Sequence, residues 1–210
     1  MEHKNKVILL AGPTASGKSK LAIKLAQHFN GEIINADSMQ VYKEVSILTS
    51  KPGVEDVKNI KHHLYSFISV KNKFSTASGD YDYKKIKDQW DKSQTPIIVG
   101  GTGLYFKVLT EGLVKIPDIP NSLRTKVRKL HKKIGQKNFF KQLIKLDSLA
   151  KKFINPSDSQ RSMRAYEVKK FTKKSLFEYI KHTEKNFKGN VFKKIFLNIP
   201  KDLLHKNIKK

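Results

Sequence analysis

The chain has 210 residues, of which 38% are hydrophobic and 10% aromatic. This is enough to build a buried core and excludes a wholly disordered protein. No apolar run approaches the ~18 residues of a membrane-spanning helix, so the sequence predicts no membrane partner. The chain contains no cysteine, which excludes disulfide scaffolds and thiolate zinc sites and agrees with a cytoplasmic location.

Positive charge is concentrated in the second half of the chain. The formal net charge is +25; the first hundred residues hold 15 basic and 10 acidic side chains, and the remainder holds 28 and 8. This asymmetry indicates a polyanionic partner for the second half. Lysine enrichment in an AT-rich genome is the alternative explanation, because 39 of the 43 basic residues are lysines. The four arginines all lie between positions 124 and 164, and arginine is the cation expected where geometry matters.

The first hundred residues alternate short apolar runs with amphipathic segments, a pattern typical of an α/β protein with a parallel sheet. The runs predict strands over residues 7–11, 32–36, 63–69 and 97–99. The amphipathic segments predict helices over residues 18–29, 84–90 and 103–112. Near the end of the chain, residues 192–198 are expected to return as a strand, and a helix is expected from residue 201.

Residues 117–189 carry no strand signal and predict a basic, all-helical insertion. Helices are expected from 121 to 134, from 139 to 146, and after a cap at 155–158. The sequence therefore predicts a core over residues 1–116 and 190–210, interrupted by this insertion. The last predicted helix reaches Lys210 without a capping residue, so we expect the core to be incomplete at its C-terminal end.

A phosphate-binding loop follows the first predicted strand and opens the first predicted helix. Its eight residues fit the pattern G-x-x-x-x-G-K-S: Gly12, Pro13, Thr14, Ala15, Ser16, Gly17, Lys18 and Ser19. The backbone N–H groups and the helix N-terminus would hold a phosphate, Lys18 would add a positive charge, and the Ser19 hydroxyl is placed for Mg²⁺. The motif predicts binding of a di- or triphosphate.

The acidic residue that usually accompanies such a loop is missing from the strand at 97–99, which runs into Gly100, Gly101 and Thr102. The candidate carboxylate is Asp37, directly after the strand at 32–36. Because the carboxyl ends of parallel strands share one rim of a sheet, we expect Asp37, Thr102 and the phosphate-binding loop to converge. The alternative is that Asp37 only caps a turn or a helix.

Five segments together resemble the bacterial tRNA dimethylallyltransferase (tRNA isopentenyltransferase) family: GPTASGKS, NADSMQVYKEVSILTSKP, HHL, IIVGGTGLYF and DSQRSMRAYEV. They occur in the family's order and cover nearly the whole chain. The resemblance implies a P-loop NTPase-like fold and transfer of a dimethylallyl group from dimethylallyl diphosphate to the N6 amine of the adenine 3′ to the anticodon. It also implies a Mg²⁺ cofactor, a tRNA anticodon stem-loop as partner, and a monomer. The loop would then hold the donor's diphosphate rather than ATP.

The resemblance also implies roles for individual residues. Asp37 matches the general base, and Lys18 and Thr102 join it as catalytic residues. The positions that match tRNA contacts are Asp37, Ser38, Met39, Gln40, Thr102, Arg124, Gln160, Arg161, Ser162, Met163 and Arg164. Two departures stand out: SILTSKP replaces the family's D-I-G-T-A-K-P, and the family continues for about another third of its length beyond LLHKNIKK.

Two other functions stay open from the residues. A P-loop kinase for a small molecule or nucleotide would use Asp37 as a base toward a hydroxyl, and ATP turnover without RNA would favour it. A catalytically impaired RNA-binding fragment of the transferase would bind tRNA tightly without prenyl transfer.

Overall fold

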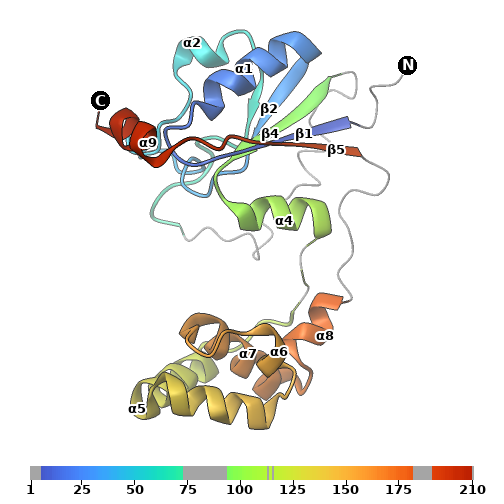
Figure 1. Ribbon diagram of the computed structural model, residues 1–210, viewed down its shortest axis with the longest axis vertical. Coiled ribbons are helices and arrows are strands. Elements are labelled where there is room, and N and C mark those ends of the chain that lie inside the picture. The colour runs from blue at the N-terminus through green and yellow to red at the C-terminus, as the bar shows by residue number, and fades with distance from the viewer. Residues whose placement is uncertain (1–5, 73–93, 113, 115, 182–190, 210) are drawn as a thin grey trace. The chain divides into compact units, whose positions relative to one another are not determined.

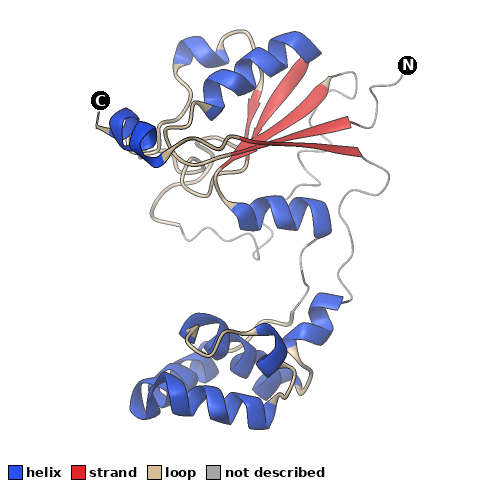
Figure 2. Cartoon of the chain, in the orientation of Figure 1, coloured by secondary structure: helices blue, strands red, loops and turns tan. Residues whose placement is uncertain are grey.

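The computed structural model describes residues 6–72, 94–112, 114, 116–181 and 191–209 (Figure 1). The chain forms two compact units. Residues Met1–Gly112 and Lys185–Lys210 form the first, named here the α/β unit, and Leu113–Glu184 form the second, the helical unit. The described strands all belong to the α/β unit, and the described part of the helical unit contains helices and loops (Figure 2). The division predicted at 116/117 and 189/190 stays a prediction.

A five-stranded sheet with the strand order β3-β2-β4-β1-β5 forms the centre of the α/β unit. Its strands are β1 (Lys6–Ala11), β2 (Gly31–Asn35), β3 (His62–His63), β4 (Thr95–Gly100) and β5 (Val191–Phe196). Every pairing between these strands is parallel. The predicted α/β class with a parallel sheet is therefore confirmed.

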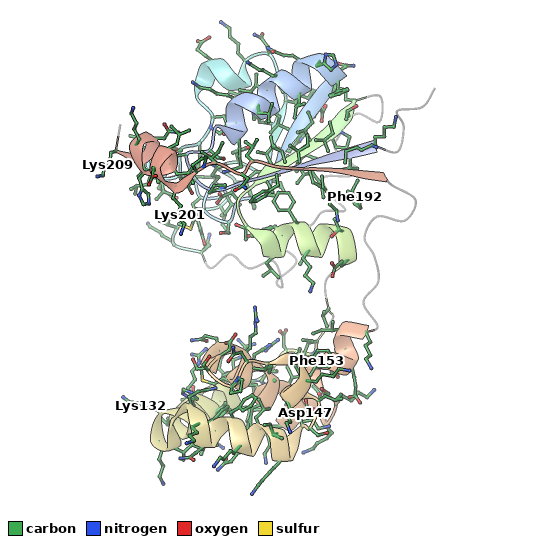
Figure 3. All side chains as sticks on the ribbon, in the orientation of Figure 1. Lys132, Asp147, Phe153, Phe192, Lys201 and Lys209 are labelled. Atoms are coloured by element: carbon green, nitrogen blue, oxygen red, sulfur yellow. The ribbon has the colours of Figure 1, made fainter. Side chains whose placement is uncertain are left out.

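Helices cover both faces of this sheet (Figure 1). On one face α1 (Lys18–Phe29) places Ala22 and Ala26 against Leu10 and its neighbours. On the other, α4 (Gly103–Glu111) places Tyr105 in a cluster against which Phe192 of β5 also packs (Figure 3). Two faces covered by helices explain why the central strands read as continuous apolar runs. The other helices that the structure describes in this unit are α2 (Val54–Val57) and α9 (Lys201–Ile208).

The strand predicted over 63–69 is wrong beyond His63. Leu64 and Ser66 adopt positive φ angles of 63° and 51°, which break the extended chain. The segment turns so that Leu64 packs on one face of the sheet and Tyr65 on the other. Residue Ile68 then forms an isolated bridge with Tyr42. The helix predicted over 84–90 lies outside the described residues.

The described residues of the helical unit form α5 (Asn121–Leu146), α6 (Ala150–Phe153), α7 (Ser159–Thr172) and α8 (Leu176–Lys181). The two helices predicted before residue 146 form one element with a break at Gly135, where φ is 73° and ψ is 163°. Glycine adopts such a φ without steric cost. The core of the unit joins these helices through Phe140, Leu143, Ala165 and Phe177.

The helical unit is strongly basic at its surface. Lysines occupy exposed positions along α5, and Lys132 extends from the ribbon in Figure 3. Asp158 caps α7 by accepting a hydrogen bond from the Arg161 N–H at 2.9 Å, in agreement with the cap expected at 155–158. Among the helices that the structure describes, none is long and apolar enough to cross a bilayer.

Gly100 gives a test of the packing between β2 and β4. A Cβ atom at Gly100 would lie 2.1 Å from the Ala36 carbonyl oxygen, whereas one at Gly103 would meet nothing within 4 Å. We expect Gly100→Ala to destabilise the fold by about 1–3 kcal/mol or more, because backbone must shift to relieve the overlap. Gly103→Ala, at the start of α4, is the matched control and should leave the thermal unfolding midpoint nearly unchanged. Equal midpoints for the two variants would contradict this account.

Candidate active site at the carboxyl edge of the sheet

The phosphate-binding loop joins β1 to α1 through two residues with positive φ. Ala15 has a φ of 61°, and Gly17, which precedes the first residue of α1, has a φ of 83°. Left-handed residues in such a turn orient successive N–H groups toward a common concave side, which favours an anion. The N-terminus of α1 adds the positive end of the helix dipole at the same place. The local geometry therefore suits a phosphate.

Lys18 lies across this loop, where its Nζ donates a hydrogen bond to the Pro13 carbonyl at 2.5 Å. Burial lowers the pKa of Lys18 below its ordinary value of 10.5, and the negative charge of Asp37 opposes this shift. An ammonium group that has lost part of its hydration gains from a nearby anion. Lys18 is thus placed to favour a negatively charged ligand.

Two serine hydroxyls of the loop fit a magnesium diphosphate. The Ser16 Oγ is buried and has no hydrogen-bond partner among the described residues, an arrangement that costs about 1–3 kcal/mol unless a ligand relieves it. Ser19 is half-exposed on the first turn of α1. The described residues contain no group of three or more acidic or histidine side chains that could hold a metal. Magnesium here would depend on phosphate oxygens together with Ser19, a donor set it accepts.

The last described helix also contacts the loop. On α9, Asn207 donates a hydrogen bond from Nδ2 to the Ala15 carbonyl at 3.2 Å. This bond holds the carbonyl of a residue with positive φ, and it ties together two segments that are 192 residues apart in the sequence. Sequence reasoning missed this contact, because no local pattern links Asn207 to the loop.

Asp37 lies at the same rim as the loop. A Cβ atom at Gly101 would be 3.8 Å from the Asp37 Oδ2 and 3.4 Å from the Gly12 carbonyl oxygen. Gly101 therefore lies between the carboxylate and the start of the loop, close to both. The Asp37 Oδ1 accepts a hydrogen bond from the Met39 N–H at 2.9 Å. Asp37 therefore does form a turn, yet its second oxygen faces the rim. This proximity agrees with the convergence expected from the parallel strands.

The charge of this carboxylate influences two tyrosines. Burial raises the pKa of Tyr65 and raises that of Tyr105 to about 12, and the negative charge of Asp37 contributes to both shifts. Both phenols are therefore neutral at physiological pH. Sequence reasoning gave neither a role, although Tyr105 stands within GGTGLYF and could have been noticed there.

The neighbours of Asp37 occupy different positions around the rim. Thr102 is half-exposed before α4, and its side chain makes no capping hydrogen bond among the described residues. Ser38 is half-buried, and Met39 is 53% exposed. The Gln40 Nε2 donates to the Thr49 carbonyl at 2.8 Å, so this amide holds the following loop in place.

The other matched tRNA positions lie in the helical unit. Arg161 has a side chain that is 75% exposed, and its Nε is 3.5 Å from the Asp158 Oδ2. The Arg164 Nη1 is 3.8 Å from the Glu167 Oε2. Arg124 is half-buried, and its Nε is buried with no hydrogen-bond partner among the described residues.

The other matched residues of α7 differ in their solvent exposure: they are Gln160, Ser162 and Met163. Gln160 is exposed and Met163 is half-buried. Ser162 is fully buried; its Oγ donates to the Asp158 carbonyl at 2.6 Å and accepts from the Gln136 Nε2 at 3.1 Å. These bonds make Ser162 a support for the start of α7.

Comparison with known proteins gives consistent matches. The family model for IPP transferase matches residues 40–210. The chain is 49% identical over 209 residues to the tRNA dimethylallyltransferase of Pelagibacter ubique (strain HTCC1062), covering 99% of this chain and 67% of that protein. It is 46% identical over 202 residues to the protein of the same name from Rickettsia massiliae (strain Mtu5), covering 95% and 56%.

A structural match agrees with these relatives. A eukaryotic dimethylallyltransferase, studied crystallographically while acting on tRNA, matches with a TM-score of 0.76 and 28% identity over 98% of this chain and 53% of that one. The chain thus spans about half to two thirds of the length of these three proteins.

The environment of Lys18 predicts how pyrophosphate binding depends on pH. Lys18→Ala should weaken binding of inorganic pyrophosphate roughly 10- to 100-fold, since hydrogen bonds to charged groups contribute ~1.5–3 kcal/mol. The pKa of Lys18 is lowered in the free protein. As the pH is raised, the ammonium should therefore lose its proton, and the wild-type affinity should begin to fall, before the pH reaches 10.5. Lys18→Arg stays charged and should lack this fall.

Calorimetric titration of wild type and Lys18→Arg at matched pH values isolates the lysine, because ionisation of the ligand affects both equally. A constant ratio of the two affinities up to pH 10.5 would contradict the assignment. Ser19→Ala should weaken binding only when magnesium is present.

Proposed function

The chain belongs to the IPP transferase family, and on that basis we propose that it transfers a dimethylallyl group from dimethylallyl diphosphate to the N6 amine of the adenine 3′ to the anticodon of tRNA. The observation that carries the proposal is the Asp37 carboxylate at the rim beside a phosphate-binding loop. One group can accept a proton and the other can hold a leaving diphosphate. These are the two requirements of N-prenyl transfer.

The donor would bind through the loop between β1 and α1. Its N–H groups and Lys18 would stabilise the negative charge that develops on the diphosphate as the allylic C–O bond breaks. Mg²⁺ held by Ser19 and the donor's phosphate oxygens would supply Lewis-acid stabilisation of the same charge. The buried Ser16 hydroxyl would gain a phosphate oxygen as its partner.

The acceptor amine would approach from the side of Asp37. Adenine N6 is a poor nucleophile, and its proton is too weakly acidic for a carboxylate to remove in advance. Asp37 would instead accept the proton as the N–C bond forms and the nitrogen becomes cationic. Since Oδ1 already accepts the Met39 N–H, Oδ2 would be the basic atom. The Thr102 hydroxyl, one residue beyond Gly101, would orient the amine.

The helical unit would hold the RNA. An adenine in a stacked anticodon loop must leave the stack to reach Asp37, at a cost of a few kcal/mol. Phosphate contacts from cations such as the exposed Arg161 and the half-buried Arg164 would offset this cost. Ser162 would support this segment rather than touch RNA, because its hydroxyl is buried. The working form would be a cytoplasmic monomer, as the sequence predicts.

Arg161 and Arg164 give a test of the RNA contacts. Replacing both with alanine should weaken tRNA binding and reduce the dependence of log Kd on log salt by ~0.7 for each single-stranded phosphate that the arginines neutralise. Lys193→Ala with Lys194→Ala is the matched control, since both lysines are exposed on β5 and carry the same total charge. Measuring tRNA binding over a series of salt concentrations distinguishes the arginine variant from the lysine variant. Equal changes of the salt dependence in the two variants would indicate a general charge effect.

Asp37→Asn is the test of the chemical step. Asparagine keeps the size of the side chain and an acceptor for the Met39 N–H but cannot accept a proton at neutral pH. We expect the single-turnover rate with labelled dimethylallyl diphosphate and tRNA to fall roughly 10²–10⁴-fold. Donor affinity should change little, because the loop and magnesium provide most of that binding.

A rate within about threefold of wild type would remove Asp37 from the mechanism. If Asp37 only formed a turn, the variant would lose stability and keep its rate per folded molecule. ATP turnover without RNA by the wild-type chain would instead support the kinase alternative.

A further inference from the structure

Asn35 is a buried polar residue whose side chain is bonded to the backbone of Asp37. It is the last residue of β2 and is completely buried. Its Oδ1 accepts the Asp37 N–H at 2.9 Å, and its Nδ2 donates to the Asp37 carbonyl at 3.0 Å. One amide group therefore holds both polar backbone atoms of Asp37.

The same amide reaches a third segment of the chain. Asn35 Nδ2 also donates to the Leu64 carbonyl at 3.0 Å. Leu64 has a φ of 63° and follows directly after β3, so this bond meets the chain where it leaves the sheet. The side chain thus joins the end of β2, the turn at Asp37 and the turn after β3.

The backbone on either side of Asn35 is already fixed. The Ala36 N–H donates to the Val99 carbonyl at 2.7 Å, and Gly100 allows Ala36 to approach β4 without a side chain between them. With Ala36 fixed by the sheet and Asp37 held by Asn35, the carboxylate has one oxygen on the Met39 N–H and the other facing Gly101.

We infer that Asn35 is a positioning residue that aims the Asp37 Oδ2 at the acceptor amine, an inference that rests on the proposed function of Asp37. A carboxamide carries a donor and an acceptor in one plane, so this one side chain can bond both the N–H and the C=O of Asp37. Aspartate at this position would keep the acceptor, lose both donor bonds and place a second carboxylate beside Asp37.

Glu32 provides a matched control on the same strand. It is buried on β2, and its Oε2 lies 2.6 Å from the His63 Nε2 of β3, so it also ties β2 to β3. Its other carboxylate oxygen lies 3.4 Å from the Lys61 Nζ, so these two contacts of Glu32 are with residues around β3 and not with Asp37. Glu32→Gln therefore tests the loss of a polar contact between β2 and β3 without disturbing the Asp37 carboxylate.

The decisive experiment is a double-mutant cycle on the single-turnover rate. Asn35→Ala should slow the wild-type enzyme ~10- to 100-fold, since displacement of a catalytic group by about 1 Å can cost ~10²-fold. In the Asp37→Asn background the same change should slow the reaction by less than about twofold, because residue 37 can no longer act as a base and its orientation no longer affects the rate. Asn35→Asp, of equal size, should behave similarly, and Glu32→Gln should leave the rate nearly unchanged. Equal losses in both backgrounds, or a matching loss in Glu32→Gln, would overturn the inference.

A second measurement does not depend on transferase activity. Amide hydrogen exchange of Asp37, followed by NMR in folded Asn35→Ala, should accelerate at least about tenfold, whereas exchange of Ala36 should not change, because its bond to Val99 is independent of the side chain. Asn35→Asp, which keeps the acceptor, should leave the Asp37 amide protected. Unchanged Asp37 exchange in Asn35→Ala overturns the inference whatever the rates show. A normal rate in Asp37→Asn alone, with accelerated exchange in Asn35→Ala, would instead refute the role of Asp37 as base.

Discussion

Ala36 and Gly100 approach so closely that no side chain fits between their backbones, and the site depends on this contact. The Ala36 carbonyl oxygen lies 2.1 Å from the position that a Gly100 Cβ would take. The approach brings the end of β2 against the end of β4, so that Asp37 follows on one side and Gly101 on the other. Gly101 in turn adjoins the Gly12 carbonyl at the start of the phosphate-binding loop. Two adjacent glycines thus set the spacing between carboxylate and loop.

The positive charge of Lys18 and the negative charge of Asp37 at this rim are held by different neighbouring groups. Lys18 is held by a backbone carbonyl of its own loop, and Asp37 is held by a backbone N–H and by Asn35. The charge of Asp37 favours the protonated form of Lys18. Neither side chain forms an ion pair among the described residues. A ligand can therefore interact with each of the two charges separately.

Sequence alone predicts those parts of the fold that local patterns determine. The loop at 12–19 was predictable because glycine positions, a lysine and a following helix occur together, and β1 and β4 because buried parallel strands are continuously apolar. The strand predicted at 63–69 failed because long-range packing and the Asn35 bond turn the chain at Leu64. The burial of Ser162 was equally hidden, since its partner Gln136 lies 26 residues away. Asp37 could be named as a candidate from its place after a strand, but the proposal that Oδ2 is its basic atom required the geometry.

The bond between Asn207 and Ala15 has a consequence for the order in which the chain folds during synthesis. The loop and β1 leave the ribosome before the helical unit, and their partners on β5 and α9 emerge only after the whole helical unit has been translated. The helical unit is continuous in sequence and can fold as soon as it is released, whereas the first-made strand waits with one edge unpaired. Newly made chains would therefore complete their basic, all-helical part before β5 closes the sheet against β1. On the ribosome, the phosphate-binding loop therefore reaches its final form only after α9 has emerged, although it is translated before the helical unit.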